Sequence, residues 1–312
     1  MRSISDLNEV RRFSGLEFLA RQVVEGFITG LHKSPFHGFS VEFAEHRIYN
    51  TGESTRHIDW KLFGRTDRLF VKRYEEETNL RCQLVIDRSP SMFYPGKALD
   101  NGLPANKEAF SVYCAAAFTQ LLRRQRDAVG LTLFSEKVDM HTPSRSSPVH
   151  FKSIFSELDR LLLDFKPGDK KQTGAASALH AVAEAIHRRS LVLIFSDMLD
   201  ASEDPRGLFS ALQHLRHNGH EVILFHVMDF QHERDFDFGP GMYRFIDMES
   251  GEEVKLFPGQ IRGQYHEAMQ KYCSAIKLRC GQYGIDYVEA DINKGFAQVL
   301  LPFLMKRANM TR

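Results

Sequence analysis

A carboxylate and two hydroxyls stand at alternate positions directly after an apolar segment of the chain. Residues 84–86 are apolar, and Asp87, Ser89 and Ser91 follow them in the pattern D-x-S-x-S. Mg²⁺ prefers oxygen ligands and takes only a few of them from a protein, while water or a bound ligand completes its shell. The motif therefore predicts a partly filled metal site with an open position. The alternative is a serine-rich turn, because such turns commonly follow strands.

Two distant segments favour the metal site over the turn. Thr173 precedes a predicted amphipathic helix at 176–187, and Asp197 follows a second apolar run at 191–195. Loops at the carboxyl ends of neighbouring parallel strands converge, and ligands bind in the crevice there. We therefore expect Asp87, Thr173 and Asp197 to meet at one edge of a parallel sheet. Taken singly, Thr173 also fits a helix N-cap and Asp197 an ordinary turn.

The order D-x-S-x-S, T-G and S-D resembles the metal-ion-dependent adhesion site of the von Willebrand factor A domain. The resemblance implies that the hydroxyls of Ser89, Ser91 and Thr173 bind Mg²⁺ directly. It also implies that Asp87 and Asp197 act largely through ordered water, and that an open sixth position accepts a carboxylate from a partner protein. Mn²⁺ and Ca²⁺ are alternative metals on the sequence alone.

A second stretch carries a narrower resemblance. Residues 49–61 read Y-N-T-G-E-S-T-R-H-I-D-W-K, and residues 69–77 read L-F-V-K-R-Y-E-E-E. Both resemble the signature of a bacterial family named only as domain of unknown function 58, in which a von Willebrand A-like domain follows. Such proteins are often encoded beside MoxR-type AAA+ ATPases. The resemblance thus implies an adaptor or partner of such an ATPase, or of its client, in protein maturation or remodelling.

Arg56, Asp59 and Trp60 lie within this signature and have two interpretations. The first, which we favour, is structural: Trp60 is a large apolar anchor with one hydrogen-bond donor, and Asp59 can pair with Arg56. The second is that the three residues form part of the partner-binding face.

Composition excludes several other classes of function. The net charge of the 312 residues is +1, which indicates neither bulk nucleic-acid binding nor attraction to a membrane surface. The four cysteines show no metal-binding spacing, and no apolar stretch is long enough to span a bilayer. We therefore expect a cytoplasmic protein without a membrane span. Residues 168–173 lack the order of a Walker phosphate loop, so no bound nucleotide is expected.

The elements that must position these residues follow from the hydrophobic pattern. From residue 80 onward, apolar strands alternate with amphipathic helices, which predicts a doubly wound α/β domain with a mostly parallel sheet flanked by helices. Residues 242–257 predict a β-hairpin inserted into this domain. Residues 1–79 are expected to form a small N-terminal α+β module, and residues 80–312 the main von Willebrand A-like domain.

Two classes of function follow from the predicted site. The first is a metal-dependent protein-interaction module, in which Mg²⁺ bridges Ser89, Ser91 and Thr173 to a carboxylate of a partner. The second is a metal-assisted hydrolase with Asp87 as nucleophile or base. A hydrolase needs a group that activates water beside the metal, and the motif loops offer no well-placed His or Glu. We therefore expect an interaction module and not an enzyme.

Overall fold

The chain divides into two compact units, one of residues 29–79 and one of residues 1–28 together with 80–312. The computed structural model describes residues 15–32, 46–48, 60–72, 80–96, 105–163, 175–199 and 206–310.

The smaller unit contains a short antiparallel pair and one helix. Strand β1 (His46–Ile48) pairs with β2 (Phe70–Lys72), so that Arg47 lies opposite Val71. Helix α3 (Trp60–Thr66) lies between them in the sequence. The side chain of Trp60 is 62% exposed and meets the ring of Phe63 edge-on.

The larger unit is built on a six-stranded sheet with the order β10-β7-β6-β3-β4-β5. All neighbouring pairs are parallel except β4 and β5, which are antiparallel. The strands are β3 (Arg81–Asp87), β4 (Ala128–Phe134), β5 (Val138–Arg145), β6 (Leu191–Ser196), β7 (Glu221–Met228) and β10 (Asp286–Asp291). The prediction of a mixed α/β fold with a mostly parallel central sheet is confirmed.

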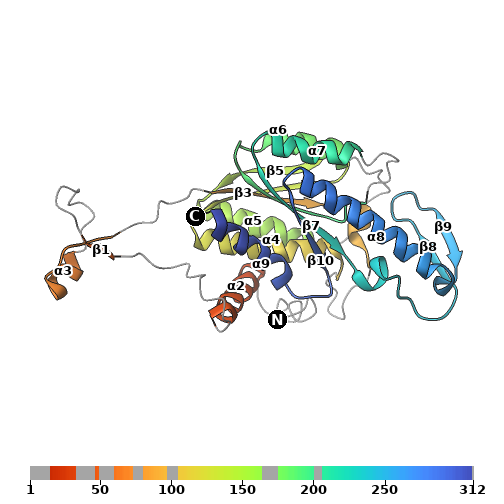
Figure 1. Ribbon diagram of the computed structural model, residues 1–312, viewed down its shortest axis with the longest axis horizontal. Helices are drawn as coiled ribbons and strands as arrows, with labels where there is room; N and C mark the ends of the chain where they lie inside the picture. Colours follow the sequence, from red (N-terminus) through yellow and green to blue (C-terminus); the bar gives the residue numbers. More distant parts are fainter. Residues whose placement is uncertain are drawn as a thin grey trace. The chain divides into compact units, whose positions relative to one another are not determined.

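Helices cover both faces of this sheet, which explains why the inner strands β3 and β6 are mostly apolar and buried along nearly their whole length (Figure 1). The helices are α2 (Leu16–His32), α4 (Lys107–Arg124), α5 (Pro148–Leu163), α6 (Ala175–Ala185), α7 (Arg206–His217), α8 (Pro258–Gln282) and α9 (Ala297–Met310). On one face, Val192 and Ile194 belong to a core shared with α6, α7 and α8. On the other face, Phe118 of α4 contacts the rings of Phe195 and Phe225.

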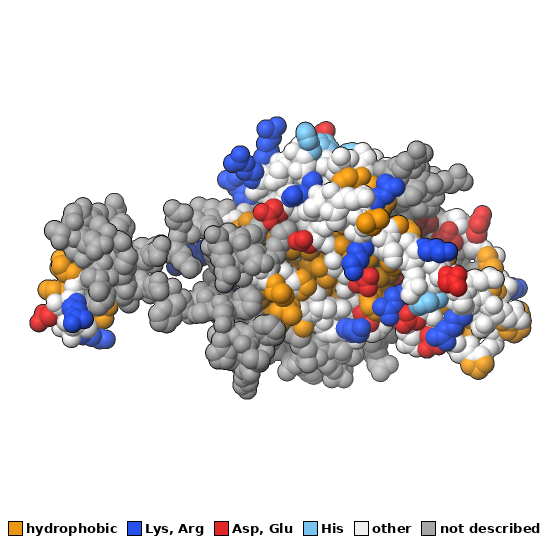
Figure 2. Space-filling model, viewed as in Figure 1, with side chains coloured by type: hydrophobic (Ala, Val, Ile, Leu, Met, Phe, Trp, Pro, Cys, Tyr) orange, Lys and Arg blue, Asp and Glu red, His pale blue; other side chains and the backbone are white. Residues whose placement is uncertain are grey.

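Three shorter elements occur at the end of the sheet where β3 and β7 finish. A 3₁₀ helix, η2 (Pro90–Phe93), follows β3, and a π-helix, η3 (Phe230–Arg234), follows β7. A hairpin of β8 (Tyr243–Ile246) and β9 (Glu253–Leu256) precedes α8 and pairs only within itself. On the face seen in Figure 2, basic and acidic side chains are interspersed among the described residues.

Candidate functional site

The parallel pairing of β3 with β6 brings together two of the predicted site residues. Asp87 is the last residue of β3, Asp197 directly follows β6, and Ile86 lies opposite Phe195 in the register of the two strands. Both aspartates are buried. Thr173, Arg56 and Asp59 lie outside the described residues. Trp60 belongs to the smaller unit, on α3.

Asp87 is held rigidly by hydrogen bonds to both of its carboxylate oxygens. The backbone N–H of Ser89 donates to Oδ1 at 2.8 Å, and the hydroxyl of Ser196 donates to Oδ2 at 2.6 Å. Burial raises the pKa of Asp87 to about 7, the charge of Asp197 adds to this, and the hydrogen bonds from Ser196 and Ser89 oppose it. Among the described residues, Asp87 forms no ion pair. The site thus contains a buried carboxylate whose charge is poorly compensated.

The two serines of the motif lie beside this carboxylate. Their Oγ atoms are 3.1 Å apart, and Pro90 begins the 3₁₀ helix η2 between them. Two neighbouring oxygens of an octahedral Mg²⁺ shell are about 3 Å apart, because each Mg–O distance is about 2.1 Å. Ser89 and Ser91 therefore already have the spacing of two adjacent ligands. The hydroxyl pair and the uncompensated carboxylate fit the cation that the sequence motif implies.

A lysine that the sequence analysis did not identify neutralises the second aspartate. The Nζ atom of Lys107 donates to Asp197 Oδ2 at 2.7 Å and to Glu233 Oε1 at 2.5 Å. The side chain of Lys107 has no exposed surface. Burial alone would lower the pKa of Lys107, but the negative charges of Asp197 and Glu233 outweigh this effect and raise the pKa. Lys107 therefore stays charged and compensates Asp197, whereas Asp87 lacks such a partner in the described part of the chain.

A buried histidine fixes the backbone of the Asp197 loop. His226 of β7 lies 2.8 Å from the Asp197 carbonyl through Nε2 and 2.6 Å from the Tyr287 hydroxyl through Nδ1. A carbonyl can only accept, so Nε2 carries the proton and Tyr287 donates to Nδ1. Burial lowers the pKa of His226 to about 4, which keeps the ring neutral. The side-chain carboxylate of Asp197 is further aligned by the N–H of Leu199, which donates to Oδ1 at 3.1 Å.

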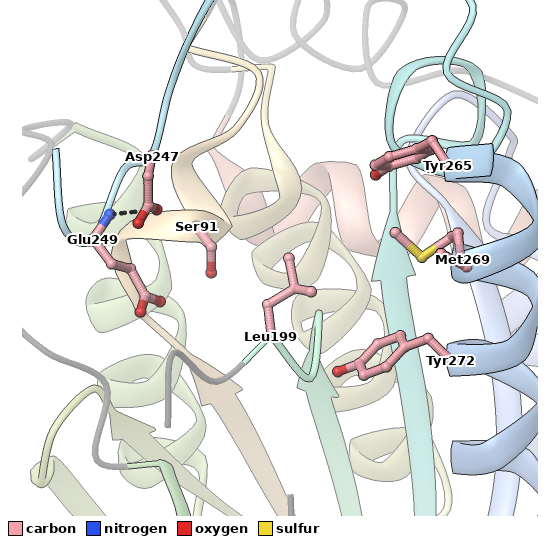
Figure 3. Close-up of a pocket in the computed structure, with 8 residues that line it drawn as sticks. Ser91, Leu199, Asp247, Glu249, Tyr265, Met269 and Tyr272 are labelled. Atoms are coloured by element: carbon pink, nitrogen blue, oxygen red, sulfur yellow. Dashed lines mark hydrogen bonds between the residues drawn. The ribbon is translucent and has the colours of Figure 1, made fainter. Parts of the chain in front are cut away.

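A pocket of about 470 Å³ opens beside Ser91 (Figure 3). Ser91 and Leu199 come from the carboxyl end of the sheet, and Tyr265, Met269 and Tyr272 come from α8. Asp247 and Glu249, from the turn between β8 and β9, complete the lining of the pocket together with Ala268. One side of the pocket is thus apolar and aromatic, and the other carries two carboxylates and a hydroxyl.

The comparisons with known proteins identify the family. A family model described as a protein of unknown function, DUF58, matches residues 45–274. The chain belongs to the DUF58 family. It is also similar to the uncharacterized proteins Rv1480 and MT1527 of Mycobacterium tuberculosis and Mb1516 of Mycobacterium bovis, each 26% identical over 215 residues. The match covers 69% of this DUF58 chain and 63% of the length of each relative.

Three solved structures resemble this DUF58 chain at 16% identity. Protein BatB from Bacteroides thetaiotaomicron matches with a TM-score of 0.37 over 74% of this chain and 99% of its own. An aerotolerance-related membrane protein from Bacteroides fragilis matches over the same shares with a TM-score of 0.38. An uncharacterized membrane-spanning protein from Vibrio fischeri matches over 73% and 96%, with a TM-score of 0.23. With TM-scores this low, the similarities support no conclusion about the site.

The expected cytoplasmic location was wrong. Two of the three similar structures are described as membrane proteins, and this finding contradicts a cytoplasmic assignment. Among the residues with a described structure, no helix combines the length and the apolar character needed to cross a membrane.

Sequence reasoning missed Lys107, Glu233 and Glu249 as members of this region. Lys107 carried a usable signal, because cations are unfavourable in the first turn of a helix and this lysine directly follows the N-cap Asn106. The described residues contain no group of three or more His, Cys, Asp or Glu side chains that could hold a metal. A metal at this DUF58 site would therefore depend on the serine hydroxyls.

Proposed function

We propose that this DUF58 protein is a metal-dependent protein-interaction module of the von Willebrand A type. Ser89, Ser91 and Thr173 would hold Mg²⁺ directly, while Asp87 and Asp197 complete the site. The observation that carries the proposal is the pair of hydroxyls 3.1 Å apart beside the buried carboxylate of Asp87.

Electrostatics support a cation at this position. A buried carboxylate with a pKa near 7 is costly to ionise, and a divalent cation nearby would favour its charged form. Hydroxyl ligands are neutral, so they leave most of the charge of the cation uncompensated. Bound Mg²⁺ supplies an electrophilic coordination position to which an outside carboxylate can bind. The chain itself orients this position, because Ser196 and the Ser89 N–H fix Asp87 while Lys107 fixes Asp197.

For the partner we propose a MoxR-type AAA+ ATPase or its client. This assignment is supported by the signature at 49–61 and 69–77, not by the geometry of the site. Arg56, Asp59 and Trp60 are candidates for a second contact surface. We propose no enzymatic activity, because a hydroxyl-rich ligand set favours accepting a carboxylate over activating a water molecule.

The first test is metal binding itself. Calorimetric titration with Mg²⁺ should show one site in the wild type and at least about tenfold weaker binding in Ser89→Ala and Ser91→Ala. Ser153→Ala, at an exposed position on α5, is the matched control and should bind like the wild type. Equal affinity in all four proteins would refute the assignment of the ligands.

The second test is partner binding at constant Mg²⁺, because the ATPase needs Mg²⁺ for its own nucleotide. The MoxR-type ATPase from the same organism should be retained by the wild type and by Ser153→Ala but not by Ser91→Ala. Retention by all three would place recognition elsewhere on the surface.

A further inference from the structure

One face of the β8–β9 hairpin packs against the rest of the larger unit. Tyr243 and Phe245, two residues apart on β8, share this face and are half-buried. The ring centroids of Phe245 and Phe236 lie 5.5 Å apart, and the ring of Phe236 lies 4.2 Å from that of Tyr265 on α8. An aromatic cluster therefore holds this face of the hairpin against α8.

The opposite face of the hairpin, which we call the outer face, is exposed. In the register of the two strands, Arg244 lies opposite Lys255, and Ile246 lies opposite Glu253. Side chains directly opposite one another in an antiparallel pair project from the same side of the sheet. The alternation continues one residue beyond each strand, so the outer face consists of six exposed residues: Met242, Arg244, Ile246, Glu253, Lys255 and Phe257.

Half of the outer face is apolar, although water has access to it. The exposed fraction is 64% for Met242, 48% for Ile246 and 48% for Phe257. Figure 2 also shows hydrophobic side chains at the surface of the end of the larger unit where the hairpin lies. Exposed apolar side chains that gather on one small element, with charged groups among them, mark an interaction surface.

The charges of the outer face favour a second copy of this chain as the occupant. Arg244 Nη1 and Glu253 Oε1 are 3.7 Å apart, and both side chains are about half exposed, so the pair contributes little within one copy. A face that carries both signs complements itself about a two-fold axis, because each basic group can then meet an acidic group of the other copy. Glu253 would instead be repelled by an anionic lipid surface.

We propose that the outer face of the β8–β9 hairpin joins two copies of this protein in a symmetric dimer. Met242, Ile246 and Phe257 leave water at the interface, and the basic residues of one copy pair with Glu253 of the other. None of the six residues lines the pocket beside Ser91, so the proposal does not depend on the metal site. One hairpin face is small for a permanent interface, and we expect a reversible dimer with a Kd in the micromolar range.

The experiment is sedimentation equilibrium of the full chain in EDTA, which excludes association through a bound metal. Between about 1 and 200 µM, the average mass should rise from 35.9 kDa towards twice that value. Ile246→Glu should weaken dimerisation at least about tenfold, because it buries a carboxylate in the apolar part of the interface. Val149→Glu is the matched control, since Val149 is an apolar residue on α5 that is 78% exposed.

A charge exchange tests the pairing between the copies. Arg244→Glu and Glu253→Arg each bring like charges together across the interface, so each variant alone should dimerise less than the wild type. An equimolar mixture of the two variants should recover association, because each supplies the charge that the other has lost. Misfolding of either variant could not produce this recovery.

Three outcomes would overturn the proposal. The first is a monomer at every concentration, which would leave the metal site untouched, since Mg²⁺ binding is measured separately. The second is association that survives Ile246→Glu and both charge variants, which would place the contact between copies elsewhere. The third is a monomer that sediments with vesicles of phosphatidylserine and phosphatidylcholine as wild type but not as Ile246→Glu, which would assign the outer face to a membrane.

Discussion

The Nζ atom of Lys107 lies 2.7 Å from Oδ2 of Asp197, and neither side chain has any exposed surface. Glu233 completes the group at 2.5 Å from the same ammonium. Asn106 caps the helix at its start by accepting from the N–H of Ala109, which sets Lys107 directly beneath the carboxyl end of β6. The start of α4 therefore determines the charge balance around Asp197.

Replacing this lysine should be strongly destabilising. Lys107→Met leaves the buried Asp197 and the half-buried Glu233 without a compensating charge, which costs about 3–5 kcal/mol of unfolding free energy. Urea unfolding followed by circular dichroism measures the change. Lys152→Met, at an exposed position on α5, is the control and should stay within about 0.5 kcal/mol of the wild type. A similarly small change for Lys107→Met would show that the ion pair contributes little.

Metal removal should lower stability in a way that depends on the serines. If Mg²⁺ binds only the folded chain, a concentration of about 100 times its Kd raises the unfolding free energy by about 2.7 kcal/mol. EDTA should abolish this increment in the wild type. In Ser89→Ala, thermal unfolding with Mg²⁺ and with EDTA should nearly coincide. An equal increment in wild type and variant would place the ion elsewhere.

The buried histidine predicts how stability depends on pH. The folded-state pKa of His226 is lowered from 6.5 to about 4, so the unfolded chain binds the proton more tightly. The stability contributed by neutral His226 is therefore present above pH 6.5 and is lost as the pH falls towards 4. In the presence of EDTA, the contribution of His226 should make the free energy of unfolding about 2 kcal/mol lower at pH 5 than at pH 7.

The His226→Gln variant should lose that part of the pH dependence, because glutamine does not titrate. His217→Gln, at an exposed position near the end of α7, should keep the wild-type slope. If the unfolding free energy depends on pH in the same way in the wild type and both variants, groups other than His226 cause the loss of stability in acid.

Two glycines should respond in opposite directions to alanine. A Cβ on Gly130 of β4 would lie 2.2 Å from Gln83 Oε1 and 2.6 Å from the Thr142 carbonyl, so Gly130→Ala should cost about 1–3 kcal/mol. A Cβ on Gly263, inside α8, would meet no atom of another element within 4 Å, so Gly263→Ala should stabilise the chain by up to about 1 kcal/mol. Thermal melts of the two variants measure both changes, and the same sign in both would contradict the argument.

Trp60 is the single tryptophan of the chain, so its fluorescence reports on its surroundings. At 62% exposure, the indole should be quenched by acrylamide almost as strongly in the folded chain as in urea. Trp60→Phe should change the unfolding free energy by less than about 0.5 kcal/mol. Strong protection from acrylamide would indicate that Trp60 packs as a structural anchor.

The central sheet could be predicted because its strands are long apolar runs bounded by polar residues. The apolar run at residues 191–195 lies within β6, which extends one residue further to Ser196. The edge strand of the sheet was harder to predict, because its hydrophobic pattern is weaker. The antiparallel strand β5 carries little hydrophobic signal, because its residues are half-buried or exposed along its whole length.

The surroundings of the site could not be read from the sequence. Lys107 is 90 residues from Asp197 and 126 from Glu233, and no local pattern links such distant charges. The π-helix η3, which delivers Glu233, depends on Asp229 accepting hydrogen bonds from Gln231 and His232. Glu249 looked like an ordinary turn residue, since its burial arises only when the hairpin packs beside α8 and η2.

The order of strands also has a consequence for how the chain is made. Asp87 at the end of β3 receives its hydrogen bond from Ser196 at the end of β6, 109 residues later. While the ribosome is still producing that stretch, β3 presents an apolar strand edge whose partner does not yet exist. Nascent chains of this protein should therefore depend on chaperones until the residue that completes the Asp87 site has emerged.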